Sequence, residues 1–368
     1  MPWCAKRCSY CDFNTYVKQE QSGGLGGPID SVRDLEFELR RLRELAGSNA
    51  RPVATLFFGG GTPTLLAPEA LGRLVDVVRE EFGLEPDAEV TTEANPETLD
   101  RSILSRLREV GFNRLSIGLQ SAVGAVLQTL GREHDADRGL EAVRWARDAG
   151  FDNLSVDLIY GSPGESIDDW RRSVEAAIEV GVDHVSAYAL KIEPGTAMGA
   201  RRRRGELLDP SPDDLADRYE LADEAFSRSG RPWYEVSNWA RPGRECRHNL
   251  GYWRGDDWLG VGPGAHSHIS GVRWWNVKHP RQAAGLLADG RLPIDSGEML
   301  SRPEQEMESV MLGIRLRDGI EVPEGAEQVV GDLVVNGLLD PDAAAVGRAI
   351  PTRRGRLLAD VITRGLVG

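Results

Sequence analysis

The sequence predicts an α/β protein with a parallel β-sheet, either an open doubly wound sheet or a barrel. From residue 53 the chain repeats one unit, in which a short strand-like run is followed by a polar or glycine-rich turn and an amphipathic helix. Several of these helices are followed by a glycine, which a left-handed C-cap favours. Because the units alternate along the chain, their strands must be parallel and joined by right-handed crossovers.

The expected elements can be placed in order along the first part of the chain. A glycine-rich link over 23–28 leads into a first helix, in which apolar residues recur at helical spacing from Val32 to Leu45 and which Asp30 or Ser31 caps. The predicted strands are 53–58, 89–92, 114–119, 153–159 and 184–190. The predicted helices are 68–82, 99–110, 137–149, 167–180 and 212–229.

The remainder of the chain has a different pattern. Residues 233–275 are rich in glycine and hold six of the nine tryptophans. After residue 301 we expect helices over 304–314 and 327–336, then a short hairpin, then a last helix over 352–364. The predicted organisation is a parallel-sheet domain over 1–205, an aromatic-rich extension over 206–300 and a small helical or winged module over 301–368.

Composition and charge exclude several classes of protein. A length of 368 residues suits two domains, or one barrel with an appendage. The chain is 40% hydrophobic and 28% charged and has no apolar run of membrane-spanning length, which excludes an integral membrane protein and a disordered one. The net charge of −14 repels polyanions, so we expect no nucleic-acid partner, while a peripheral membrane contact stays open.

Three of the four cysteines form a CxxxCxxC array, made by Cys4, Cys8 and Cys11, while Cys246 stands apart. This is no disulfide framework, and the N-terminus carries no secretory or transit signal, so we expect a reduced, cytoplasmic protein. Soft thiolate donors select zinc or an iron–sulfur cluster. Structural zinc needs a fourth protein ligand, and the nearest histidine, His134, is far along the chain. A [4Fe–4S] cluster on three cysteines leaves one iron open to an outside ligand.

Polar residues stand at the ends of four predicted strands. These are the segment 59–62 with sequence Gly-Gly-Gly-Thr, and then Glu93, Gln120 and Asp157. Any one of them could simply cap the helix that follows. Because the carboxyl ends of parallel strands open on one face, the four together predict a shared site.

Five motifs follow one another in order, at 4–14, 58–64, 93–96, 114–121 and 157–164. Together they resemble the radical S-adenosylmethionine (SAM) superfamily, and within it the branch of oxygen-independent coproporphyrinogen III dehydrogenases and HemW-type heme chaperones. The resemblance implies a partial (β/α)6 barrel of the TIM-like kind over 1–205. It also implies a [4Fe–4S] cluster and SAM, whose sulfonium is cleaved after one-electron transfer.

The resemblance further implies a role for each motif residue. The cluster ligands are Cys4, Cys8 and Cys11. The implied SAM contacts are Tyr10 beside the adenine, Gly60, Gly61 and Thr62 beside the methionine, Glu93 and Gln120 at the methionine and ribose ends, Arg132 on a carboxylate, and Asp157 on a ribose hydroxyl or neighbouring ligand. An electron donor such as a flavodoxin or ferredoxin is the implied redox partner.

Two features separate the members of that branch. Dehydrogenases carry a fourth cysteine where this chain has Phe13, and HemW-type proteins carry an H-N-x-x-Y-W motif. Here that motif is made by His248, Asn249, Tyr252 and Trp253. An imidazole can ligate iron and aromatic faces suit a porphyrin, so the resemblance implies heme contact, whereas the residues alone would indicate core packing.

We therefore expect a heme chaperone that passes heme to an acceptor protein. The alternatives are an enzyme that oxidatively decarboxylates coproporphyrinogen III, and a zinc-stabilised interaction protein without redox chemistry. Members of the superfamily usually run an apolar strand ending in proline before the first cysteine, where this chain has only Met1, Pro2 and Trp3. We expect that the natural start lies upstream of Met1.

Overall fold

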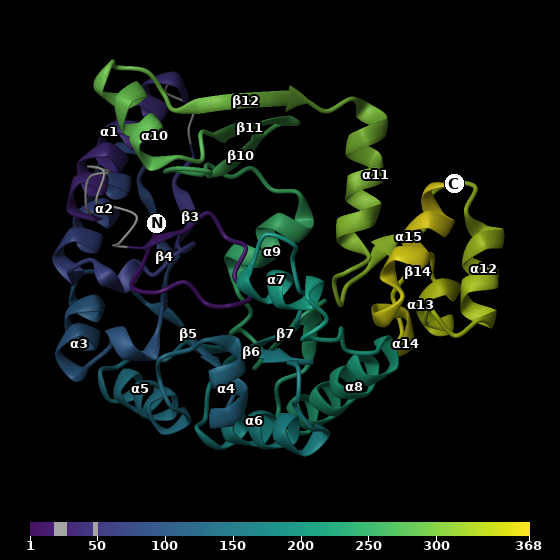
Figure 1. Ribbon diagram of the computed structural model, residues 1–368. Helices are drawn as coiled ribbons and strands as arrows, with labels where there is room; N and C mark the ends of the chain where they lie inside the picture. The colour runs from purple at the N-terminus through teal and green to yellow at the C-terminus, as the bar shows by residue number, and fades with distance from the viewer. Residues whose placement is uncertain (18–27, 47–50) are drawn as a thin grey trace.

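The computed structural model describes the whole chain except residues 18–27 and 47–50. Its centre is a seven-stranded sheet curled into a partial barrel, with helices around its outer side (Figure 1). The neighbouring strands are, in order, β3 (Val53–Phe58), β4 (Leu84–Ala94), β5 (Arg114–Gln120), β6 (Leu154–Tyr160), β7 (His184–Ala189), β9 (Asn238–Ala240) and β8 (Trp233–Glu235). Strands β3 to β7 are parallel and β9 and β8 add antiparallel to them, which confirms the expected partial parallel barrel.

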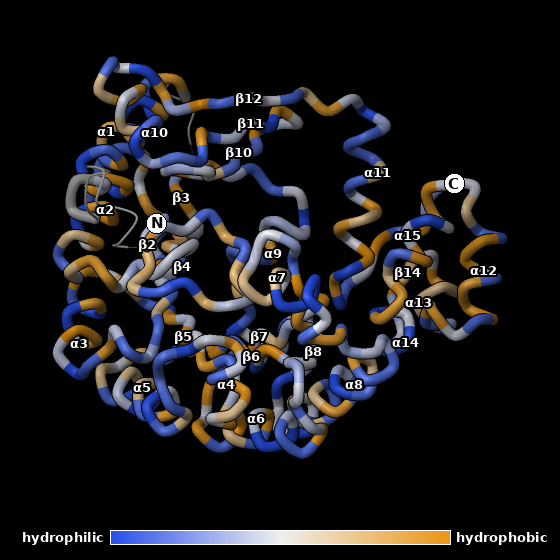
Figure 2. The backbone as a smooth tube through the Cα atoms, in the orientation of Figure 1, coloured by the Kyte–Doolittle hydropathy of each residue, from blue (hydrophilic) through white to orange (hydrophobic). Residues whose placement is uncertain are grey.

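The outer helices follow the predicted β/α units. They are α1 (Pro28–Ala46), α2 (Pro68–Glu81), α3 (Arg101–Glu109), α5 (Ala136–Asp148), α6 (Ile167–Glu179) and α8 (Pro212–Arg228). In Figure 2 they alternate between hydrophilic and hydrophobic stretches, as expected for helices with one face on a core. That core lies between the helices and the convex face of the sheet and includes Leu71, Leu104 and Val156.

Four short helices before the C-terminal module were missed from the sequence, and the first helix begins earlier than expected. The missed helices are α4 (Gly124–Leu130), α7 (Ala197–Arg203), α9 (Arg247–Arg254) and α10 (Pro280–Ala288). Helix α1 begins at Pro28, because proline suits the first turn of a helix, so Asp30 and Ser31 lie inside it and the predicted cap was wrong. The glycine-rich link of 23–28 otherwise falls outside the described residues.

A second, antiparallel sheet follows α9 and spans the top of the view in Figure 1. It consists of β10 (His266–Ile269), β11 (Val272–Asn276) and β12 (Ile294–Met299), with α10 (Pro280–Ala288) inserted before β12. Buried Glu38 of α1 ties this sheet to the barrel, because its carboxylate accepts hydrogen bonds from the Asn276 side chain at 2.6 Å and the Gly262 amide at 2.9 Å.

The C-terminal module has its own small core, formed by residues such as Ile314, Val330 and Ile362. Its elements are α11 (Arg302–Gly313), β13 (Ile320–Glu321), α12 (Glu327–Val335), α13 (Pro341–Ala345), β14 (Arg348–Ala349), α14 (Arg353–Leu357) and α15 (Ala359–Val367). The predicted hairpin after α12 is present only as a short antiparallel pairing of Leu339 with Pro351. Asp340 caps α13, which lies between the two sides, and β14 pairs with the distant β13. The predicted last helix is divided into α14 and α15 at Leu358.

Within the described ranges, none of the helices combines the length and the apolar character that crossing a bilayer requires.

Candidate cofactor site in the barrel

The concave face of the sheet is polar. Leu115, Val156 and Val185 belong to the core beneath the helices, and side chains alternate along a strand. The residues between them therefore point into the barrel, together with their partners on neighbouring strands: Thr55, Glu89, Glu93, Arg114, Ser116, Asp157, His184 and Ser186. A polar interior of this kind can bind a charged ligand.

The cysteine loop is fixed at both ends. Strand β1 (Trp3–Cys4) pairs with β2 (Tyr16–Val17), which closes the loop at its base. In the middle, the Ser9 amide donates to the Leu130 carbonyl at 3.1 Å, and the Met198 amide donates to the Ser9 carbonyl at 2.8 Å. These bonds hold the loop against the C-terminal end of α4 and the N-terminal end of α7.

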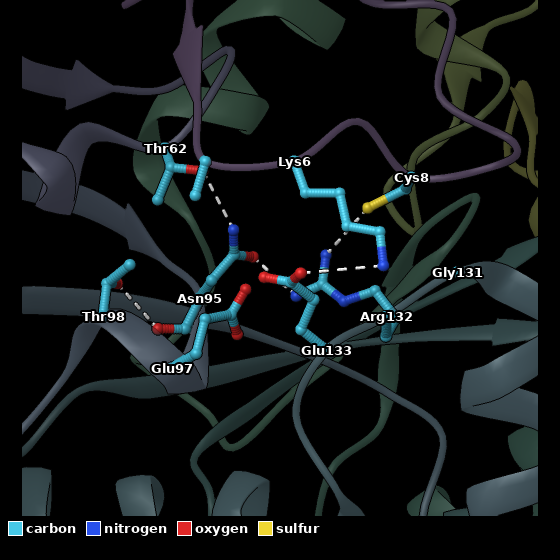
Figure 3. Close-up of a pocket in the computed structure, with 10 residues that line it drawn as sticks. Lys6, Cys8, Thr62, Asn95, Glu97, Thr98, Gly131, Arg132 and Glu133 are labelled. Atoms are coloured by element: carbon cyan, nitrogen blue, oxygen red, sulfur yellow. Dashed lines mark hydrogen bonds and ion pairs between the residues drawn. The ribbon is translucent and has the colours of Figure 1, made fainter. Parts of the chain in front are cut away.

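A chain of hydrogen bonds links two of the three thiols. The Thr62 hydroxyl lies 3.8 Å from Cys4 Sγ and accepts a hydrogen bond from the Asn95 amide at 2.9 Å. The Arg132 guanidinium donates to Asn95 Oδ1 at 2.6 Å and to Cys8 Sγ at 3.4 Å. Figure 3 shows Cys8, Thr62, Asn95 and Arg132 around a small pocket that they help to line. The sequence predicted Thr62 and Arg132 here but missed Asn95, although Asn95 lies in the 93–96 motif.

Gly118 on β5 makes room for this network. A Cβ atom at Gly118 would lie 2.8 Å from the Gln120 side-chain amide and 3.3 Å from both Arg132 and Asn95. Gln120 ends the strand with a positive φ of 63°, which a residue other than glycine rarely adopts. Strain of this kind persists only where the surroundings impose it, and it is concentrated at functional sites.

The thiols suit an iron–sulfur cluster in their chemistry and charge. Burial raises the pKa of Cys4 and Cys11, so these thiols need a metal or cation to ionise. The half-buried Arg132 guanidinium supplies a positive charge beside Cys8. No group of three His, Cys, Asp or Glu side chains in the described part of the chain is placed to hold one metal ion. In a cube each cysteine ligates a different iron, so three thiols on one loop fit that group.

Two carboxyl groups lie in the open part of the barrel. Glu93 accepts a hydrogen bond from the Gly60 amide at 3.1 Å, and Asp157 accepts one from the Ser116 hydroxyl at 3.2 Å. Burial, and then repulsion from Asp157, raises the pKa of Glu93 to about 7, and burial also raises the pKa of Asp157. Both side chains are half-buried, so a ligand in the barrel could reach them.

The glycines of the Gly-Gly-Gly-Thr segment are needed for a close approach within the chain itself. The Gly61 amide donates to the Met1 carbonyl at 2.6 Å, and the Thr62 amide donates to the Trp3 carbonyl at 2.7 Å. A Cβ at Gly61 would lie 2.4 Å from the Trp3 carbonyl oxygen, and Gly60 has a φ of +103°. The approach to a methionine moiety, which the resemblance implied for these glycines, stays a prediction.

Tyr10 occupies the side of the loop that faces an apolar cluster. It packs against the cluster that includes Leu130, Ile159 and Met198. Burial raises the pKa of Tyr10 above its ordinary value, so its hydroxyl stays protonated. The contact of Tyr10 with an adenine, which the resemblance implied, stays a prediction.

Comparisons with known proteins agree with this geometry. The radical SAM superfamily model matches residues 1–177. A heme chaperone HemW of Mycobacterium tuberculosis (strain CDC 1551 / Oshkosh) is 49% identical over 377 residues, which cover 100% of this chain and 93% of that protein. The chain belongs to the HemW family. A heme chaperone HemW of Bacillus subtilis (strain 168) is 32% identical and covers 100% of this chain and 98% of its own length.

The HemW family shares its fold with a solved enzyme. The structure of coproporphyrinogen III oxidase (HemN) from Escherichia coli, described as a radical SAM enzyme, matches with a TM-score of 0.83 at 25% identity. The match covers 100% of this chain and 88% of that one. The likeness extends over the C-terminal module as well as the barrel.

The H-N-x-x-Y-W motif expected of the HemW family lies on α9, beside strands β3 and β4. Glu89 caps this helix, because its carboxylate accepts from the Arg247 amide at 3.1 Å and the His248 amide at 3.2 Å. His248 Nδ1 is 2.8 Å from the Thr55 hydroxyl, and its Nε2 is 2.9 Å from the Tyr252 hydroxyl. The helix therefore lies along the middle of these strands, whereas the cysteine loop lies past their carboxyl ends.

The motif does not present its four side chains to one surface. The His248 ring stacks on Phe57 with centroids 5.1 Å apart, and Tyr252 packs edge-on against Trp258 at 4.9 Å. Trp253 instead bonds the Glu235 carboxylate of β8, and Asn249 is half-buried on the helix. His248 and Trp253 therefore hold α9 against the barrel, whereas Tyr252 stays partly exposed.

Proposed function

We propose that this chain is a cytoplasmic heme chaperone that carries a [4Fe–4S] cluster and SAM, binds heme and passes it to an acceptor protein. Its membership of the HemW family over its whole length supports this function. The observation that carries the proposal is the loop with the three thiols. The network of Thr62, Asn95 and Arg132 holds this loop at the barrel mouth, which is the end of the barrel where the parallel strands have their carboxyl ends. A reducing compartment suits free thiolate ligands.

In this proposal the cysteines ligate the cluster and the barrel mouth holds SAM. When bound, the two cofactors supply one-electron chemistry. The residues of the chain bind and orient them: Tyr10 packs on the adenine, and Glu93, Gln120 and Asp157 take the polar groups of SAM. Backbone at Gly60, Gly61 and Thr62 lies against its methionine end, and Arg132 pairs with a carboxylate or a cluster thiolate. A flavodoxin or ferredoxin is the proposed source of electrons.

The proposed heme surface is formed by partly exposed aromatic residues of α9, of the segment after it and of the β10–β11 pair. Tyr252 is 38% exposed, and Trp258 lies between it and His268, with ring centroids 4.8 Å from the histidine. His248 holds Tyr252 through its Nε2 contact, Asn249 on the same helix is a further proposed contact, and Trp253 fixes α9 to β8. Flat apolar rings of this kind cover a porphyrin face well.

A second candidate function is the oxidative decarboxylation of coproporphyrinogen III. The full-length likeness to coproporphyrinogen III oxidase favours it, because the same barrel and C-terminal module are present. Phe13 argues against it, since this exposed side chain, 62% accessible, stands where dehydrogenases place a fourth cysteine.

One preparation tests both functions. The anaerobically reconstituted protein is titrated with hemin, and in parallel is incubated with coproporphyrinogen III, SAM and a reductant. We expect saturable hemin binding and no protoporphyrinogen IX. Formation of protoporphyrinogen IX would assign the enzyme function, and a preparation that binds no hemin would remove the chaperone.

A further inference from the structure

Three histidines lie in the aromatic region proposed to bind heme, and two of them have both ring nitrogens occupied. His248 bonds Thr55 and Tyr252, at 2.8 and 2.9 Å. His268 Nδ1 lies 3.4 Å from the Asp256 carbonyl, and its Nε2 accepts from the Gly271 amide at 3.3 Å. Either imidazole would have to break a hydrogen bond before it could ligate iron.

The third histidine, His266, is exposed at the start of β10. Among the described residues, no hydrogen-bond donor or acceptor pairs with either of its ring nitrogens. Its ring stacks on Trp275 with centroids 5.8 Å apart and an interplanar angle of 29°. Stacking fixes the plane of the imidazole and leaves a ring nitrogen free to bind iron, as a histidine ligand requires.

His266 shares a sheet face with the other proposed heme contacts. In the antiparallel ladder His266 pairs with Trp275 and His268 pairs with Arg273, and residues two apart on a strand point the same way. Trp258 bridges to His268 and contacts its ring, so it lies on that face too. The exposed imidazole therefore lies at one edge of an aromatic surface, and flat aromatic rings can pack against a porphyrin face.

This edge of the sheet is joined to the cysteine loop. The Asn14 side-chain amide donates to the Pro263 carbonyl at 3.2 Å and to the Lys278 carbonyl at 2.9 Å, so it bridges the two strands just beyond His266 and Trp275. A Cβ at Gly264 would lie 2.7 Å from the Asn14 amide, so the contact is close. In Figure 1 the N-terminal segment runs below this sheet. Heme held at His266 would lie on the same side of the molecule as the cluster loop.

We propose that His266 is the residue that ligates the heme iron, and that His248 is a positioning residue that holds Tyr252 through its Nε2 contact. The inference deepens the proposed function and depends on it. The covalent change is one coordinate bond from an imidazole nitrogen to iron, with no electron transferred. His266 must be neutral to form it, so a proton is released where the ring was charged.

His279 provides a matched control. It is also exposed and lies near an aromatic ring, but it meets Tyr16 edge-on, with an interplanar angle of 73°, instead of stacking on it. It lies at the start of α10, outside the β10–β11 ladder. Its removal should leave heme binding unchanged.

The experiment is a hemin titration of the full chain with its cluster reconstituted, followed by absorption and electron paramagnetic resonance spectra. His266→Gly should weaken hemin binding by about tenfold or more, the loss of roughly one coordinate bond's net contribution. It should also abolish the spectroscopic signature of imidazole ligation, and added free imidazole should restore that signature. His248→Ala should weaken binding less and keep the signature, and His279→Gly should match the unaltered chain.

The outcomes separate the two proposals. If the unaltered chain binds no hemin, the proposed function fails. If it binds hemin while His266→Gly keeps the same affinity and the same spectrum, the assignment of His266 fails and the function stands. Loss of the imidazole signature in His248→Ala alone would likewise overturn the assignment. Iron and sulfide content, measured on each variant, shows that the barrel is intact.

Discussion

The Arg132 guanidinium lies 3.4 Å from Cys8 Sγ, although 124 residues separate the two in the sequence. The same guanidinium donates to Asn95 at 2.6 Å and to the Gly118 carbonyl at 3.2 Å. Asn95, just after β4, and the Gly118 carbonyl on β5 therefore set the orientation of the guanidinium. In this orientation its positive charge lies beside the Cys8 thiol of the cysteine loop.

Replacing Arg132 should weaken retention of the cluster. Arg132→Leu removes the half-buried cation beside Cys8 and leaves Asn95 without its donor, so we expect about 10- to 100-fold weaker iron binding, as for other residues that support metal ligands. Arg132→Lys should recover part of this, because lysine supplies the charge without the planar fork. Iron and sulfide per chain measure the effect. Arg101→Gln, which loses an exposed ion pair with Asp148 and a cation–π contact with Trp145 far from the cysteine loop, is the control. Equal iron content in all variants would contradict the role.

Gly61→Ala should destabilise the barrel mouth. The added Cβ would meet backbone, the Trp3 carbonyl oxygen at 2.4 Å, which cannot move as a flexible side chain can. We expect a loss of about 1–3 kcal/mol in the free energy of unfolding, as for overpacking elsewhere. Gly124→Ala is the matched control, because its Cβ would meet nothing within 4 Å and alanine favours a helix. Chemical denaturation of both variants makes the comparison, and equal stabilities would refute the close approach.

The stability that Glu38 contributes, through its hydrogen bonds between α1 and the second sheet, should depend on pH. Burial raises the pKa of Glu38 from 4.5 to about 7, so the folded chain binds this proton more tightly than the unfolded chain does. The contribution of Glu38 to stability is therefore greatest below about pH 4.5 and declines as pH rises to about 7. Glu38→Gln should flatten the dependence of the unfolding free energy on pH in that window. Glu44→Gln, at an exposed position of α1, should leave it unchanged. A slope identical in all three proteins would show that Glu38 is not responsible.

Asp223 should be essential for docking the C-terminal module. This buried carboxylate of α8 accepts from Arg353 at 2.6 Å, Arg356 at 2.8 Å and the Trp239 indole at 2.9 Å. Asp223→Asn leaves two arginines without a counter-charge, and we expect a loss of about 3–5 kcal/mol. Glu224→Gln, which breaks only the exposed pair with Arg228, should cost under about 1 kcal/mol. Thermal unfolding measures both changes. If Asp223→Asn and Glu224→Gln had the same melting temperature, Asp223 would not hold the C-terminal module in place.

The barrel could be predicted because its signals are local. Each of its five parallel strands carries apolar residues on the face that packs on the core, and the helices after them carry one apolar face, so period and turns were enough to place them. The cysteine array and the polar residues at strand ends were equally visible. The contact between Arg132 and Cys8 was beyond the sequence alone, because no local pattern encodes which distant side chains converge.

The aromatic region and the C-terminal module were harder for a related reason. The six tryptophans of 233–275 suggested one aromatic extension, yet Trp233 and Trp239 lie in the barrel sheet while Trp274 and Trp275 lie in the second sheet. Strands of three to five residues carry too little pattern to be assigned to a sheet. The predicted hairpin is reduced to the pairing of Leu339 with Pro351, because Asp340 and Pro341 begin a helix between its two sides and β14 pairs with the distant β13.

The most direct test of the account is cofactor analysis of anaerobically reconstituted protein. We predict about four irons and four sulfides per chain, and an electron paramagnetic resonance signal of the reduced cluster that changes when SAM is added. Zinc with no sulfide would identify the zinc-stabilised alternative. A cluster whose signal ignores SAM would contradict the assignment of the barrel mouth as its binding site.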